Sequence, residues 1–282
     1  MPWALLTPVI GLAMVIIPVL ATNGLLESWG FIDAEANPVG LYGLIVFLTI
    51  PFGLMALLTL AWVWLVERRP MANIGLTRVG AMPSFARGLG LGLLTILSVV
   101  VAILLAGGFE VGRIAPALSS PQGLLGIALL APSFILQAGS EELLFRGWLL
   151  SALGRKLNLA LAATISSALF ALLHYGPGQP WLVTLGGFLY GLFAACWAIK
   201  AGNIWGVMGW HAAWNWLLAV GFELPVTGLD AHVPALLAKL TPQAGAVLTG
   251  GAEGPEGSIF CVAFLAIWSA VLIWRYRRAA RA

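Results

Sequence analysis

The chain has 282 residues, of which 61% are hydrophobic and 9% are charged, against roughly 45–50% and about 25% in ordinary soluble domains. This composition excludes a soluble globular domain and indicates a polytopic membrane protein with a lipid-facing surface. The net charge is only +3, and we expect the lipid bilayer as a partner and no nucleic acid. Cys196 and Cys261 lie in apolar runs without disulfide or metal spacing, so we expect buried, inert thiols.

Eight apolar stretches are candidates for membrane-spanning helices, each of which needs about 20 residues. They lie at roughly 3–26, 39–66, 88–109, 123–153, 157–175, 181–200, 203–222 and 258–276. The sequence therefore predicts an all-α polytopic membrane fold with about eight transmembrane helices and an active site near the bilayer midplane. The fourth stretch is too long for one straight span, and its Pro132 and Gly139 predict a kink or break there.

The predicted organisation is a single transmembrane domain over residues 1–282. Three N-terminal spans fill 1–122, a core of four spans fills 123–220, and 258–282 holds the last span and a basic cytoplasmic tail. Between them, 223–257 is a non-cytoplasmic loop rich in Gly, Pro and Ala, in which we expect a short helix at Val233–Leu240. No second domain or soluble module is indicated.

Two pairs of glycines four residues apart predict close packing between helices. They are Gly88 with Gly92 and Gly187 with Gly191. Small residues at this spacing allow the backbones of two membrane helices to approach each other.

The placement of lysine and arginine predicts the orientation. With eight spans, one side of the membrane receives two basic residues, Arg113 and Lys239, and Arg146 stays inside. The other side receives Arg68, Arg69, Arg78, Arg87, Arg155, Lys156, Lys200, Arg275, Arg277, Arg278 and Arg281. The positive-inside rule therefore places both termini in the cytoplasm. A chain like this, without an organelle signal, fits a bacterial cell membrane.

Very few ionisable groups lie inside the predicted spans, and all of them fall within the core of four spans. They are Glu141, Glu142, Arg146, His174 and His211, joined by the strongly hydrogen-bonding amide of Asn215. Lipid offers an ionised group no water, so such residues are costly and are functional by default. His232, in the loop, is expected to be solvated.

Helical spacing separates the roles of the two adjacent glutamates. Glu142 and Arg146 are four residues apart, in the order that favours an ion pair, and we expect this pair to be structural. Glu141 points elsewhere and has no local partner. An unpaired carboxylate in a cavity of low dielectric constant binds a proton more readily, which suits a general base.

The remaining polar residues fall at similar depths. Phe170 and His174 share one helical face, as do His211 and Asn215, both pairs being four residues apart. With a rise of 1.5 Å per residue, Glu141, the two histidines and Asn215 all lie near the middle of a ~30 Å hydrocarbon core. Four side chains from three spans are therefore expected to converge.

The motifs Glu141-Glu142-x-x-x-Arg146, Phe170-x-x-x-His174 and His211-x-x-x-Asn215 follow in this order on successive apolar spans. This pattern resembles the CAAX protease and bacteriocin-processing family, intramembrane endopeptidases that include the Ras-converting CAAX endoprotease. The region of Gly187 and Gly191, and Gly202-Asn203-Ile204-Trp205 before His211, are similar to the same pattern. The resemblance covers roughly residues 123–220, which would be the catalytic core.

The resemblance implies a role for each residue of the motifs. Glu141 with His174 would activate a water molecule for attack on the scissile carbonyl. His211 and Asn215 would donate hydrogen bonds to the tetrahedral oxyanion, and Glu142 with Arg146 would hold the architecture. The substrate would be a membrane-associated peptide or lipidated protein, of CAAX type or leader type.

The sequence leaves several alternatives open. Glu141, His174 and His211 could form a catalytic zinc site with water as the fourth ligand, although we favour a mechanism without a cofactor. A proton-coupled transporter could use the same buried groups as a relay, but no inverted repeat supports it. A catalytically silent scaffold or immunity protein is the third alternative, which the complete set of catalytic-type residues disfavours.

Overall fold

The computed structural model describes residues 6–176 and 178–279, which form a bundle of helices with one small sheet. The long helices are α1 (Thr7–Ser28), α2 (Gly40–Ala61), α3 (Ala81–Leu105), α4 (Pro121–Glu142), α6 (Leu159–Leu173), α7 (Trp181–Ala201), α8 (Trp205–Gly221) and α10 (Ile259–Ala279). The short α-helices are α5 (Leu150–Leu153) and α9 (Ala246–Thr249), and the strands are β1 (Phe109–Ile114) and β2 (Ala238–Pro242). Trp62–Val66 and Leu143–Leu149 are π-helical, and the 3₁₀ turns are Met71–Ile74, Pro116–Ser119, Gly251–Glu253 and Pro255–Gly257.

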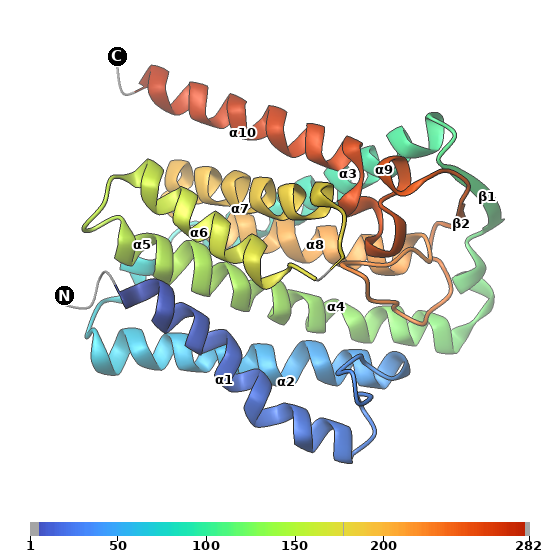
Figure 1. The fold of residues 1–282 in the computed structure, drawn as a ribbon, viewed down its shortest axis with the longest axis horizontal. Helices are drawn as coiled ribbons and strands as arrows, with labels where there is room; N and C mark the ends of the chain where they lie inside the picture. Colours follow the sequence, from blue (N-terminus) through green and yellow to red (C-terminus); the bar gives the residue numbers. More distant parts are fainter. Residues whose placement is uncertain (1–5, 177, 280–282) are drawn as a thin grey trace.

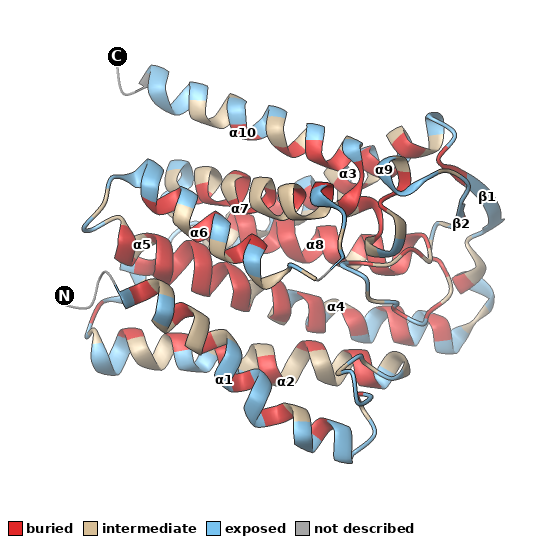
Figure 2. Ribbon diagram, viewed as in Figure 1, coloured by how far each residue is buried: buried red, intermediate tan, exposed pale blue. Residues whose placement is uncertain are grey.

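Helix α8 lies inside the bundle, with α3, α4 and α7 packed against it (Figure 1). Helices α1 and α2 lie beyond α4 on one side, and α10 covers α7 on the other (Figure 1). Figure 2 shows that α8 is buried along nearly its whole length, whereas α1 and α10 are largely exposed. Exposed apolar side chains such as Leu20, Leu57 and Ile267 mark the surface that faces lipid.

The expected all-α membrane fold is confirmed, and each of the eight predicted spans contains a helix. In the described part of the chain, six helical segments are long and apolar enough to cross a membrane. The two others are shorter, since α6 has 15 residues and α8 has 17. Because α8 is enclosed by protein, it does not need to match the thickness of the lipid layer.

The start of α1 and the end of α10 lie at the same end of the bundle (Figure 1). Lys200, Arg277 and Arg278, in the last turns of α7 and α10, lie at this end, which we call the basic end. The β1–β2 sheet and the segment 223–257 lie at the opposite end (Figure 1). Arg281 is outside the described residues.

The fourth apolar stretch differs from the expectation. Of the predicted kink or break at Pro132 and Gly139, the break is absent, because α4 is helical through both residues. The irregular part comes later, where Leu143–Leu149 forms a π-helix that continues into α5. Wide turns of this kind are rare and are frequent at functional sites, and here the π-helix begins directly after the two glutamates.

The predicted short helix at Val233–Leu240 is also wrong. This segment is not helical and leads into β2, which pairs antiparallel with β1, Leu240 lying opposite Val111.

Lys239 forms a 2.8 Å salt bridge with Glu223. Partial burial works to raise the pKa of Glu223, but the hydrogen bonds from Lys239 and from the Ala235 backbone outweigh it and lower that pKa.

The predicted close packing at the glycine pairs is confirmed. A Cβ atom at Gly88 would overlap the backbone oxygen of Gly206, and one at Gly92 would overlap that of Trp210. A Cβ atom at Gly191 would lie 2.8 Å from the Cα atom of Ser167. Helices α3 and α8 therefore meet backbone to backbone, as do α7 and α6 nearby.

We predict that Gly88→Ala lowers thermal stability, because the new methyl group would push α3 away from α8 at a cost of about 1–3 kcal/mol. The matched control is Gly90→Ala on the same helix, where an added Cβ has no neighbour within 4 Å among the described residues. Thermal unfolding of both variants in detergent would measure the difference. Equal melting temperatures would contradict the close contact.

Candidate active site

The structure brings the four predicted catalytic residues together. Glu141 extends from α4 towards two imidazole rings: its Oε1 atom lies 4.0 Å from His174 Nε2, and its Oε2 atom lies 3.6 Å from His211 Nε2. Asn215, one turn after His211 on α8, lines the same cavity as both histidines. The expected convergence of three spans is therefore present.

Glu142 has a larger role than its sequence spacing indicates. Its Oε1 atom accepts hydrogen bonds from Arg146 Nη1 at 3.2 Å and from His211 Nδ1 at 2.9 Å. The predicted pair with Arg146 is confirmed, and both side chains are fully buried. The same carboxylate also orients His211, a contact that spacing along one helix could not reveal because the two residues are 69 positions apart.

Each histidine has one ring nitrogen already engaged. His174 Nδ1 lies 2.8 Å from the backbone oxygen of Phe170, and a carbonyl can only accept, so Nδ1 carries the proton. His211 Nδ1 likewise donates to Glu142. In both neutral rings the Nε2 atom is then an acceptor, and both Nε2 atoms face Glu141.

The ring of Phe170 contacts the rings of both histidines. It lies 4.4 Å from the ring of His174, centroid to centroid, which confirms that the two residues share a helical face. The guanidinium carbon of Arg146 lies 4.3 Å from the centroid of Phe170, a distance typical of a cation–π contact. The charge of Arg146 is thus balanced by one carboxylate and one aromatic face.

Gln137 is a residue of the site that the sequence analysis missed. Its Oε1 atom accepts a hydrogen bond of 3.0 Å from Asn215 Nδ2, and both side chains are buried. This bond fixes the amide of Asn215 and leaves its second N–H free for another acceptor. Gln137 is four residues before Glu141 on the same helical face, a spacing that could have identified it.

The site lies at a cavity of about 70 Å³, enough for roughly two water molecules at ~30 Å³ each. Three of the four predicted catalytic residues line one part of it, together with Gln137, Phe170 and Tyr190; they are His174, His211 and Asn215. Thr227, Glu253 and Glu256, from the segment 223–257, also line it. Of all the described lining residues, Thr227 alone is exposed, and the side chain of His174 is 28% exposed.

The three candidate zinc ligands, Glu141, His174 and His211, are all donors that zinc accepts. However, within residues 6–176 and 178–279 no three His, Cys, Asp or Glu side chains are arranged closely enough to hold a metal ion. The arrangement therefore does not fit a preformed metal centre, and we derive no catalytic step through a metal.

Residues 122–217 match a family model described as type II CAAX prenyl endopeptidase Rce1-like. Over this segment, the chain is similar to the CAAX prenyl endopeptidase family. The matched segment contains all six predicted site residues, and the resemblance drawn from the three motifs is confirmed. No curated protein and no solved structure matches the chain. The family indicates a CAAX-type intramembrane endopeptidase, a protease within a multi-pass membrane protein.

We predict that Glu142→Leu lowers the free energy of unfolding by about 3–5 kcal/mol, because Arg146 would remain buried without its carboxylate. Arg146→Met should be costly for the converse reason. The double variant Glu142→Leu/Arg146→Met should melt closer to the wild type, since it removes both buried charges together. Melting temperatures of the three variants would check this, and a double variant less stable than either single one would contradict it.

Proposed function

We propose that this protein is an intramembrane endopeptidase in which Glu141 and the histidines activate a water molecule without a metal. The observation that carries the proposal is that the Glu141 carboxylate faces the Nε2 atoms of His174 and His211, which are hydrogen-bond acceptors in the neutral rings. A carboxylate and two Nε2 atoms face one another at 3.6 and 4.0 Å, too far apart for direct hydrogen bonds. A water molecule about 2.8 Å from both atoms of such a pair fits this gap and can donate to each.

In this reaction Glu141 takes a proton from the water molecule, and the oxygen of the water attacks the carbonyl carbon of the peptide bond. His174 Nε2 accepts the second hydrogen bond of the water and orients it. When the C–N bond breaks, Glu141 returns the proton to the departing nitrogen. Glu141 can act in this way because Arg146 is occupied by the neighbouring Glu142.

The negative charge that develops on the carbonyl oxygen must be stabilised by hydrogen-bond donors. Asn215 supplies one N–H, held in place by Gln137. His211 can supply Nε2–H only when its ring is doubly protonated, because Nδ1–H is already committed to Glu142.

We expect Glu141→Ala to abolish cleavage of a quenched membrane-peptide library by the purified protein while leaving its melting temperature nearly unchanged, because Glu141 makes no ion pair with Arg146. Cleavage by the wild type should be indifferent to a strong chelator. Loss of cleavage with chelator and recovery with zinc would instead establish the zinc-dependent mechanism. Full activity in Glu141→Ala would contradict both.

We also propose that the substrate reaches the site from the end of the bundle that carries residues 223–257. Thr227 is the exposed residue of the cavity lining, and we take it as the mouth of the cavity. It belongs to the segment 223–257, which lies at the end of the bundle opposite the last turns of α7 and α10 (Figure 1). With both termini in the cytoplasm of a bacterial cell, this mouth faces the non-cytoplasmic side. The substrate is then a membrane-associated peptide or lipidated protein segment exposed on that side.

The cavity must widen before a peptide can bind, because about 70 Å³ does not hold an extended chain. At the mouth, Glu256 Oε2 accepts hydrogen bonds from the backbone and the hydroxyl group of Thr227, at 3.0 and 2.9 Å. Glu256 Oε1 accepts one from Trp214 on α8 at 2.8 Å. These contacts hold the segment over the site and are the ones that must open.

This direction of access can be tested by blocking the mouth. In a background with Cys196 and Cys261 replaced by alanine, a bulky membrane-impermeant maleimide on Thr227→Cys should stop cleavage and should attach from the outside of intact cells. The same reagent on Lys200→Cys, at the basic end, should attach only after the cells are opened and should leave cleavage intact. The reverse pattern would refute the proposed direction.

A further inference from the structure

The hydroxyl group of Tyr190 lies at the site without an assigned role. Tyr190 is 6% exposed, and its hydroxyl oxygen has no hydrogen-bond partner among the residues that the structure describes. Buried hydroxyl groups are normally hydrogen-bonded, so an exception requires an explanation. This one belongs to a residue that lines the catalytic cavity together with His211 and Asn215.

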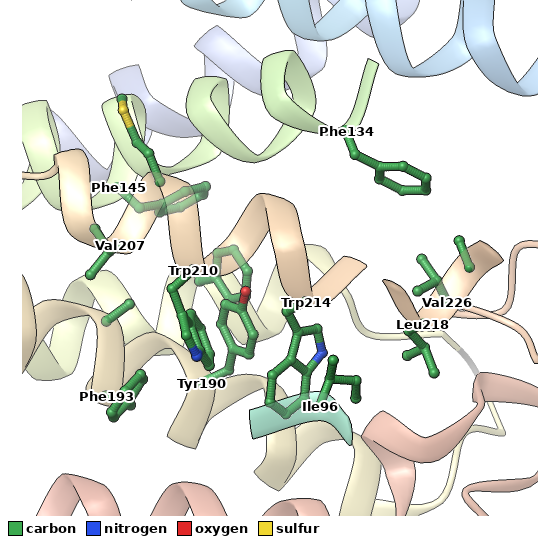
Figure 3. Packing of buried hydrophobic residues seen from close by; sticks show 14 of the residues in the cluster. Ile96, Phe134, Phe145, Tyr190, Phe193, Val207, Trp210, Trp214, Leu218 and Val226 are labelled. Carbon is green, nitrogen blue, oxygen red and sulfur yellow. The ribbon is translucent and has the colours of Figure 1, made fainter. Parts of the chain in front are cut away.

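The ring of Tyr190 is held from several sides. It stacks on Phe170 with centroids 5.7 Å apart and planes inclined by 7°, and it lies 5.0 Å from the ring of His211. Trp210 and Trp214 of α8 flank it at 4.8 and 6.2 Å. Figure 3 shows the ring between these two tryptophans, with its oxygen directed away from Phe193. The aromatic contacts therefore fix the direction of the hydroxyl group before any substrate binds.

The proposed donors and the proposed base come from different helices. Tyr190 comes from α7 and Asn215 from α8, whereas Glu141 comes from α4. A carbonyl attacked by water from the Glu141 side would therefore present its oxygen towards α7 and α8. A hydroxyl group whose direction is already fixed suits a donor to this oxygen. The protein does not have to rearrange when the oxygen becomes negatively charged.

We propose that Tyr190 is a further catalytic residue, whose hydroxyl group donates a hydrogen bond to the oxyanion beside Asn215. This inference rests on the proposed endopeptidase function. The water oxygen bonds to the carbonyl carbon and the electron pair of the C=O bond moves to the oxygen, while Tyr190 keeps its proton throughout. As the C–N bond breaks, the pair returns, and Glu141 protonates the nitrogen.

Tyr190→Phe tests the proposal by removing one oxygen atom while keeping the ring and its stacking. With the library peptide that the wild type cleaves best, kcat should fall about 100- to 1,000-fold, with KM changed less than threefold. The melting temperature should stay constant, because no hydrogen bond within the described protein is lost. Tyr175→Phe, at an exposed tyrosine, is the matched control and should cleave like the wild type.

A second measurement separates catalysis from packing. A phosphinate analogue of the same peptide mimics the tetrahedral intermediate and should bind Tyr190→Phe more weakly by about the factor lost in kcat/KM. Unchanged kcat, or a reduced kcat with unchanged affinity for the phosphinate, would overturn the role of Tyr190 and leave the proposed function intact. A wild type that cleaves no peptide would overturn the proposed function and this role together.

Discussion

The site depends on how the two adjacent carboxylates of Glu141 and Glu142 are given different partners. Both lie in a buried site, where an ionised group is costly. Glu142 is buried between Arg146 and His211, so its charge is compensated by one cation and one ring N–H. Arg146 pairs with Glu142 and not with Glu141, whose carboxylate faces the two imidazole rings instead. One residue along α4 thus separates the glutamate that is paired with Arg146 from the one that we propose as the general base. The same contact sets the tautomer of His211, and therefore which of its nitrogens faces the cavity.

Backbone packing supplies the rigidity that this charge arrangement requires. Gly88 and Gly92 let α3 approach α8 so closely that a methyl group would not fit, and Gly191 does the same for α7 against α6. Helix α8 carries His211 and Asn215, so a shift of this helix would alter the distances to Glu141. Lipid provides no hydrophobic force between helices, and close van der Waals contact takes its place. The positions of the proposed catalytic residues on α8 therefore depend on the glycines of α3.

The sequence predicted the fold class, the helical segments and the convergence of Glu141, His174 and His211, because mid-span polar residues are rare and depth follows from a fixed rise per residue. It could not predict the contact between Glu142 and His211, or between Asn215 and Gln137, since these depend on how helices rotate about their axes. It failed at Val233–Leu240, where pairing with a distant strand overrides local helix propensity. It also misplaced the irregular turn of the fourth span, because Pro132 fits within a helix whose neighbours support it.

Glu256 shows how the covering segment and the chemistry are connected. Its carboxylate joins Trp214, one residue before Asn215 on α8, to Thr227 at the mouth of the cavity. The helix that carries His211 and Asn215 is therefore also bonded to the segment 223–257 beside the cavity. Any movement that admits a peptide past Thr227 must exchange these hydrogen bonds for others, and those bonds re-form only when the mouth closes. Closure in turn excludes bulk water, which strengthens every charge interaction around Glu141. In the proposed mechanism, opening for the peptide and closing for the reaction are therefore separate steps.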